Sequence, residues 1–184
     1  MKNKITAVLA LLLCLCLAAS SCGADISALE GFCFAVQDFD IDAANKCVLD
    51  GSEKYFERVL AYFRALSDEQ KETAKKLFSK MAFSEFKEND GVCTLNVKYV
   101  NFQKLIKTVE NDVVTGSTAT ESLERILESG RIEMQFTEIA KEVKVTLSKA
   151  EGKAYLTLGY LGENEEFTRI LGLDTFLGWY SEQR

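Results

Sequence analysis

The sequence predicts an α+β fold in which N-terminal helices pack on a curved antiparallel sheet. Over residues 26–81, apolar residues recur every three or four positions, which is the period of an amphipathic helix. Over much of residues 83–100 and 132–160, apolar and polar residues alternate, which is typical of half-buried strands. The 184 residues contain no internal repeat and no linker-like stretch, so we expect one domain after the leader.

Four helices are expected before the first strand. Asp40 or Asp42 can cap the second helix, because an aspartate accepts hydrogen bonds from backbone N–H groups of the first turn. Ser67 and Gln70 form a capping box that opens the fourth helix. The expected helices cover residues 26–39, 43–49, 53–66 and 67–81.

A β-hairpin is expected next, with strands over residues 83–87 and 92–100. Asp90 and Gly91 form its turn, since Asp-Gly supplies the positive φ that a tight turn needs. In the second strand, Tyr99 is expected on the apolar face, which it shares with Cys93, Leu95 and Val97. Two helices should follow, capped by Asn101 and by the capping box of Thr118 and Glu121.

The remainder of the chain is expected to contain three strands and two short helices. Ile132, Met134 and Phe136 alternate with polar residues, which predicts the first of these strands. The last strand ends at Tyr160, and the two closing helices are too apolar to form a loose tail. The strands are expected at residues 132–136, 143–147 and 154–160, and the helices at 165–171 and 174–183.

An apolar run at the N-terminus has the features of a secretory leader. Lys2 and Lys4 precede 13 apolar residues, fewer than the roughly 20 that a membrane-spanning helix needs. The run ends in small residues before Cys22, and the segment LAASSCG at residues 17–23 resembles a bacterial lipobox. In a lipobox the cysteine receives a lipid before the leader is cleaved.

We therefore expect a lipoprotein signal peptide at residues 1–21 and a single α+β domain at residues 22–184. Cys22 would carry the lipid and hold the domain on the outer face of the bacterial cytoplasmic membrane. Cleavage by ordinary signal peptidase after Ser21 or Ala24 is the alternative, and it would release a secreted protein.

The charge of the mature chain bears on its partners. Cleavage after residue 21 removes two lysines and no acid, so the net charge of −6 becomes −8. Basic residues are interleaved with acidic ones, which argues against binding of nucleic acid or electrostatic binding to an anionic bilayer. Membrane attachment is therefore expected through the lipid alone.

The composition excludes several kinds of catalytic and metal site. The chain has no histidine, so it has no Ser-His-Asp or Cys-His system and no His-containing zinc site. Alternating aspartates at residues 38–42 lack the glycine and glutamate of an EF-hand loop. Buried thiols are favoured for Cys33, Cys47 and Cys93, and a single disulfide between two of them is the alternative. We expect no metal and no cofactor.

Three short segments carry a resemblance to a known group of proteins. FAVQDFDIDAA at residues 34–44, VKVTLSKAEGK at 143–153 and EFTRILG at 166–172, together with the lipobox, are similar to small Gram-positive lipoproteins. Those lipoproteins carry a cystatin-like or nuclear transport factor two-like domain. The resemblance implies a sheet wrapped around helices as a cone with a pocket, and it implies no particular activity.

Three functions are weighed for such a domain. The first is binding of a small apolar or amphipathic ligand in the cone, with Tyr99 and Tyr160 lining the pocket; ordinary packing of both tyrosines is the alternative. The second is protein interaction through a sheet face or through Trp179 and Tyr180, although Trp179 also suits a core position. The third is isomerase-like or dehydratase-like chemistry by an Asp–Tyr pair. No residues mark such a pair, so a non-catalytic binding module is expected.

Overall fold

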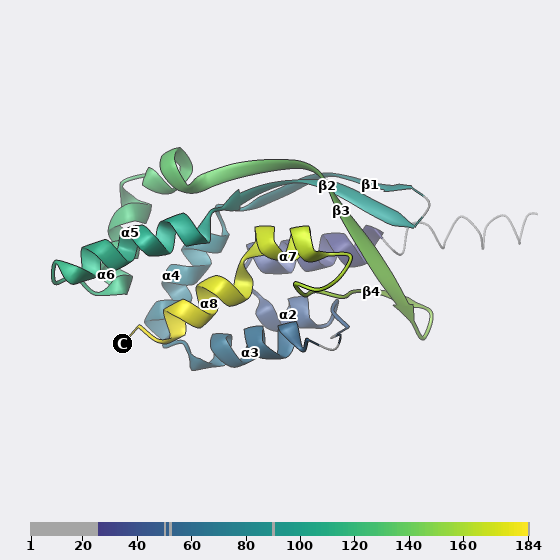
Figure 1. Cartoon of the computed structure of the whole chain (residues 1–184), viewed down its shortest axis with the longest axis horizontal. Coiled ribbons are helices and arrows are strands. Elements are labelled where there is room, and N and C mark those ends of the chain that lie inside the picture. Colours follow the sequence, from purple (N-terminus) through teal and green to yellow (C-terminus); the bar gives the residue numbers. More distant parts are fainter. Residues whose placement is uncertain (1–25, 50, 52, 90, 184) are drawn as a thin grey trace, which may run out of the picture.

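The computed structural model describes residues 26–49, 51, 53–89 and 91–183 and confirms the α+β class (Figure 1). Four strands form one antiparallel sheet in the order β1-β2-β3-β4, and most of the helices lie on one side of it. The predicted signal peptide and Cys22 lie outside the described residues. Among the described helices, none has the length and apolar character to cross a membrane.

The four predicted N-terminal helices are present. The first covers residues 26–37. Asp40 caps the second, as its Oδ1 accepts a hydrogen bond from Ala43 N at 2.9 Å. That helix is shorter than predicted and begins two residues earlier. The capping box of Ser67 and Gln70 is also confirmed. The labelled helices are α2 (Ile41–Asn45), α3 (Tyr55–Ala65) and α4 (Asp68–Phe78).

The first hairpin forms as predicted, from β1 (Ala82–Asn89) and β2 (Val92–Val100). Cys93, Leu95 and Val97 are buried on the face that packs against the helices. The predicted alternation stops there, because Tyr99 is half-buried and Val100 is buried. The pairing of β2 with β3 (Thr137–Ala150) shifts register between Leu95 and Val97, just before this change.

The prediction of a strand at residues 132–136 is wrong. These residues form a short π-helix, η1 (Ile132–Phe136), after α5 (Phe102–Val114) and α6 (Ala119–Glu128). Ile132 and Phe136 are buried while Met134 is 74% exposed. Apolar residues at i, i+2 and i+4 fit a strand, but the outer two also share one face of a helix. The predicted caps of α5 and α6, Asn101 and Thr118, are both confirmed.

The last strand is shorter than predicted, because β4 (Lys153–Leu156) ends four residues before Tyr160. Beyond Leu156, the buried side chain of Asn164 takes the place of strand pairing. Its Oδ1 accepts from Thr146 N at 2.8 Å, and its Nδ2 donates to Thr146 O at 2.8 Å and Thr157 O at 3.0 Å. A side-chain amide thus satisfies the backbone groups that a longer β4 would have paired.

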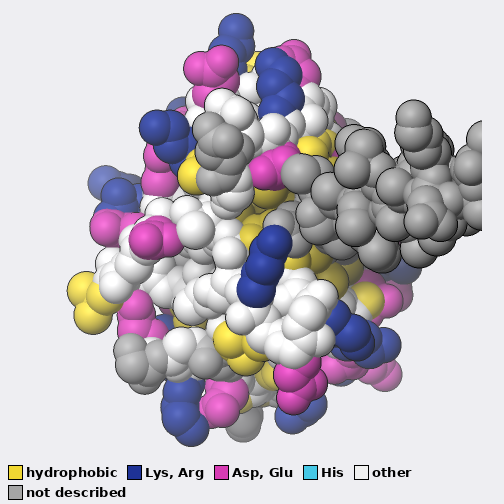
Figure 2. All heavy atoms as spheres, turned by 90° about the vertical axis from the view of Figure 1, so that its right-hand side faces the viewer, with side chains coloured by type: hydrophobic (Ala, Val, Ile, Leu, Met, Phe, Trp, Pro, Cys, Tyr) yellow, Lys and Arg dark blue, Asp and Glu magenta, His cyan; other side chains and the backbone are white. Residues whose placement is uncertain are grey.

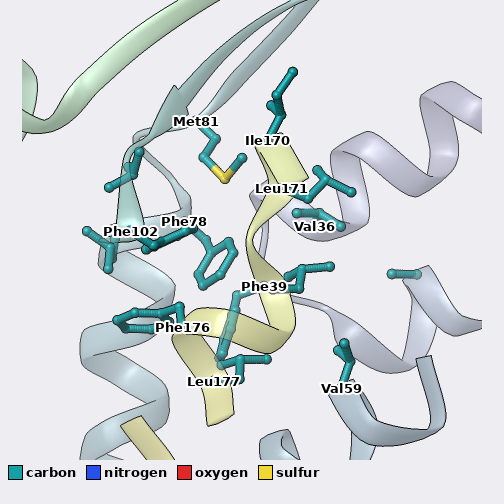
Figure 3. Close-up of a cluster of buried hydrophobic side chains, with 14 of the residues drawn as sticks. Val36, Phe39, Val59, Phe78, Met81, Phe102, Ile170, Leu171, Phe176 and Leu177 are labelled. Atoms are coloured by element: carbon teal, nitrogen blue, oxygen red, sulfur yellow. The ribbon is translucent and has the colours of Figure 1, made fainter. Parts of the chain in front are cut away.

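The two C-terminal helices, α7 (Glu165–Leu171) and α8 (Leu173–Ser181), pack on the body as predicted. Figure 3 shows Phe176 of α8 beside Phe78 and Phe102 in the core. The ring centroids lie 5.8 Å and 4.8 Å from that of Phe176. Gly172 joins the two helices at φ 56°, and a Cβ there would lie 2.8 Å from the ring of Phe102.

The described part of the sheet is open and is not closed into the predicted cone. Among the described residues no pairing joins β1 to β4, the two edge strands, so the sheet is not closed. Cys33, Cys47 and Cys93 are thiols, as favoured, and Cys33 and Cys93 are buried as predicted, whereas Cys47 is only half-buried.

Candidate functional site

A cavity of about 420 Å³ lies where the end of β2 meets the junction of α7 and α8. Tyr99 and Tyr160, the two residues predicted to line a pocket, both line this cavity. They come from separate parts of the chain that the tertiary structure brings together. The other lining residues are Val100, Asn101, Phe102, Gln103, Arg169, Ile170, Gly172 and Thr175.

Tyr99 is positioned by its neighbour across the sheet. It pairs with Glu138 of β3, and its hydroxyl donates to Glu138 Oε2 at 2.7 Å. Asn101 Nδ2 donates to the other carboxylate oxygen at 2.7 Å, while Asn101 Oδ1 caps α5 by accepting from Lys104 N. The hydrogen bonds from Asn101 and then Tyr99 lower the pKa of Glu138, so this carboxylate is ionised at neutral pH.

Tyr160 is positioned by a second carboxylate, that of Asp174 in α8. Its hydroxyl donates to Asp174 Oδ1 at 2.6 Å, and the buried Tyr55 of α3 donates to the same oxygen at 3.3 Å. The backbone N–H of Thr175 also donates to this oxygen, at 2.8 Å. Asp174 therefore connects α3, α8 and the segment after β4 at one wall of the cavity.

The backbone around Tyr160 is held by Glu53. Its carboxylate accepts from Tyr160 N at 3.0 Å and from Leu161 N at 2.8 Å. A Cβ at Gly159 would lie 2.5 Å from Glu53 Oε1, so the absence of a side chain at Gly159 permits this approach. Sequence reasoning missed Glu53, Glu138 and Asp174, because no local pattern distinguishes them from the other acids.

Both tyrosines are held in the neutral form. Burial raises the pKa of Tyr99 to about 12, and the hydrogen bond to Glu138 contributes. Burial and the hydrogen bond to Asp174 raise the pKa of Tyr160 to about 12 in the same way. At neutral pH each phenol therefore keeps its proton, which it donates to a carboxylate.

Arg169 contributes the cationic group of the cavity lining. It pairs with Glu165, one turn earlier in α7, and its side chain is 65% exposed. Aromatic and aliphatic walls with a guanidinium group at the edge suit a small molecule that has an apolar body and a polar end. Within the described ranges, no cluster of three or more Cys, Asp and Glu residues suits a metal ion.

The second predicted surface, at Trp179 and Tyr180, is largely occupied by the protein itself. Tyr180 is fully buried, and its hydroxyl lies 2.9 Å from Thr120 Oγ1 of α6. Gln70 of α4 donates to the Tyr180 carbonyl at 2.7 Å. Trp179 stacks on Tyr180 with ring centroids 5.9 Å apart and is half-buried. This end of α8 thus packs against two other helices.

A wider hollow of about 720 Å³ lies between the starts of α4 and α6. The capping boxes of Ser67 with Gln70 and of Thr118 with Glu121 already satisfy backbone donors of both helices. The Tyr99–Tyr160 cavity is therefore the better candidate, because it combines aromatic walls, a cation and tyrosines fixed by carboxylates.

The comparisons with known proteins give no match: no family model, no curated protein and no solved structure is similar to this chain at a significant level.

Proposed function

We propose that this protein is a lipid-anchored component of the bacterial cell envelope that binds a small amphipathic ligand in the Tyr99–Tyr160 cavity. The lipid on Cys22 holds it at the outer face of the cytoplasmic membrane, and the domain carries out no catalysis. The observation that carries the proposal is the convergence of Tyr99 and Tyr160 on one cavity. Their hydroxyls are fixed by carboxylates, so the walls are set before a ligand arrives.

The arrangement of the hydroxyl groups supports binding over Asp–Tyr catalysis. Tyr160 and Asp174 are the pair that such chemistry would use, and they are in hydrogen-bond contact. However, Asp174 Oδ1 also accepts from Tyr55 and from the backbone of Thr175. Its position is that of a connection between α3 and α8, and the cavity is lined by Tyr160 and Thr175 without the carboxylate.

The likeness to cystatin-like and nuclear transport factor two-like lipoproteins belongs to the proposal. Helices that precede and pack on an antiparallel sheet support it. The pair α5 and α6 lies between β2 and β3, and the start of α5 contributes Phe102 and Gln103 to the cavity lining. The proposed ligand site therefore has the start of this helical segment as one of its walls.

Native mass spectrometry of the mature protein from its own cells tests ligand binding. We expect a small molecule to co-purify with the parent protein. Gln103→Trp, which places a large ring at the cavity wall, should abolish binding of this molecule. Lys107→Trp is the matched control, because Lys107 is also exposed on α5 but lies outside the lining. If the parent carries no small molecule, or Gln103→Trp retains it at the parental level, the binding function is rejected.

A separate experiment tests the anchor. Cys22→Ser should abolish incorporation of labelled palmitate and move the protein from the membrane fraction to the soluble fraction. Cys47→Ser is the control, because it removes a half-buried thiol that has no place in the lipobox. Equal labelling of Cys22→Ser and the parent would reject the lipoprotein assignment.

Protein interaction remains the second candidate function, and the exposed residues Met134 and Ile139 favour it. Met134 lies in η1 and is 74% exposed, and Ile139 lies just after it, at the start of β3, and is 69% exposed. A partner bound there would be lost from native mass spectra of Ile139→Lys and retained in those of Gln103→Trp. The opposite pattern would reject this surface in favour of the cavity.

A further inference from the structure

Three parts of the chain lie toward one end of the long axis of the molecule. Figure 1 shows the turn between β1 and β2, the turn between β3 and β4, and the start of the helix at residues 26–37, all on the right-hand side. The turn between α5 and α6 and the C-terminus lie at the opposite end. The side chains of Asn89, Glu151 and Lys153 are exposed at the two hairpin turns.

The distance along the chain from Cys22 to this end is short. Only four Cα–Cα steps separate Cys22 from Ile26, and an extended chain spans at most about 14 Å over that length. A lipid on Cys22 therefore keeps the start of residues 26–37 within about two to three headgroup layers of the bilayer, since each interfacial layer is about 5–8 Å thick. Figure 1 shows both hairpin turns on the same side of the molecule as this helix start.

We infer that the end of the molecule formed by the two hairpin turns rests on the membrane surface, and that the cavity faces the space outside the bilayer. This inference rests on the lipid anchor of the proposed function. Figure 2 views this end directly and shows hydrophobic side chains near its centre, with lysine, arginine, aspartate and glutamate around them. The exposed charges of Glu151 and Lys153 keep the turn between β3 and β4 out of the hydrocarbon layer, where charged side chains are costly.

The length of β2 gives the distance between the hairpin turn and the cavity. Val92 is at the hairpin turn, and Tyr99 is at the cavity, seven residues further along the strand. At about 3.3 Å per residue, the two are roughly 23 Å apart. In the inferred orientation β2 leads away from the membrane, and this separation exceeds the thickness of the headgroup layer, so the cavity lies outside the bilayer.

Energy transfer from dye-labelled protein to acceptor lipids tests the orientation. The full-length lipidated protein is placed in vesicles of phosphatidylcholine and phosphatidylglycerol that contain an acceptor dye on the headgroup. Each variant carries one dye on an exposed cysteine, at Lys153→Cys, Gln103→Cys or Val114→Cys, and reports the distance of that position from the membrane. All three also carry Cys47→Ser, and the other two described thiols, Cys33 and Cys93, are buried. We expect the greatest loss of donor fluorescence at position 153, less at 103 and least at 114.

Equal losses at the three positions, or the greatest loss at position 114, would overturn the orientation. Vesicle flotation of the same samples separates this failure from failure of the anchor. A protein that floats with vesicles but gives the wrong order contradicts only the orientation. If the parent does not float and Cys22→Ser behaves in the same way, both the anchor and the orientation are contradicted. The ligand experiment with Gln103→Trp does not depend on either result.

Discussion

Phe39 ends the N-terminal helix in a conformation that usually requires glycine. Its φ is 59°, and its N–H donates to Val36 O at 3.0 Å while Asp40 N donates to Ala35 O at 2.8 Å. These two bonds define a Schellman motif, in which glycine is the common residue at this position. The ring of Phe39 lies 5.4 Å from that of Phe63 and 5.1 Å from that of Phe78. Burial of the ring thus outweighs the backbone preference.

Phe39→Gly tests which of these two effects is larger. Glycine would relieve a left-handed conformation that costs about 1–2 kcal/mol, but loss of a buried phenylalanine ring costs about 3–5 kcal/mol. We expect a net decrease of about 2–3 kcal/mol in the free energy of unfolding, measured by urea denaturation. An unchanged or increased stability would show that the backbone term dominates.

At the scale of elements, the sheet is shaped by two bulges on either side of β2. Glu85 in β1 and Glu142 in β3 both have positive φ, at 55° and 53°, and the pairing shifts register in both neighbouring ladders. Asn96 of β2 accepts a hydrogen bond from Glu142 N at 3.0 Å, which satisfies a donor that the bulge removes from the ladder. Bulges increase local twist, so these two allow the sheet to curve over the helices.

The turn between β3 and β4 also contains a residue in a backbone conformation that its side chain disfavours. Ala150 pairs with Lys153, so Glu151 and Gly152 form a two-residue turn, and their φ angles are 51° and 75°. Asparagine tolerates this conformation better than glutamate, and Asn-Gly is the favoured pair in such turns. We expect Glu151→Asn to raise the free energy of unfolding by about 0.5–1 kcal/mol, as measured by thermal and urea denaturation.

Gly152→Ala serves as the comparison for this turn. A Cβ at Gly152 meets no atom within 4 Å, so any destabilisation comes from the positive φ alone. The two substitutions should therefore change stability in opposite directions, and a decrease with Glu151→Asn would contradict the assigned turn geometry.

At the scale of the whole molecule, Asp174 connects the parts of the chain that enclose the cavity. Its Oδ1 accepts from Tyr55 of α3, from Tyr160 after β4 and from the backbone of Thr175 in α8. Tyr55 is fully buried, so its hydroxyl depends on this acceptor. The same carboxylate thus contributes to the stability of the core and to the position of a cavity wall.

Asp174→Ala should lower the free energy of unfolding by about 2–4 kcal/mol, because it leaves a buried tyrosine hydroxyl without its acceptor. Asp174→Asn keeps an oxygen at the same place and should cost less. Urea denaturation measures both, and native mass spectrometry shows whether the ligand is lost as well. Equal stability of Asp174→Ala and the parent would mean that the three hydrogen bonds contribute no net stability.

The sequence by itself determined the features that depend on a few neighbouring residues. The caps at Ser67, Asn101 and Thr118, the turn at Gly91 and the α+β order of elements follow from hydrogen bonds and φ preferences within one or two turns of chain. The same local reasoning failed at residues 132–136, where five residues are too few for their spacing to distinguish a strand from a helix.

Only the tertiary structure decided how the cavity is built. Tyr99 and Tyr160 were both expected to line a pocket, but their position at the end of β2, next to α7 and α8, depends on contacts between distant residues. Glu138 and Asp174, which fix the two hydroxyls, resemble every other acid in the sequence. Hydrogen bonds across such separations follow from how whole elements pack, and local periodicity carries no information about that packing.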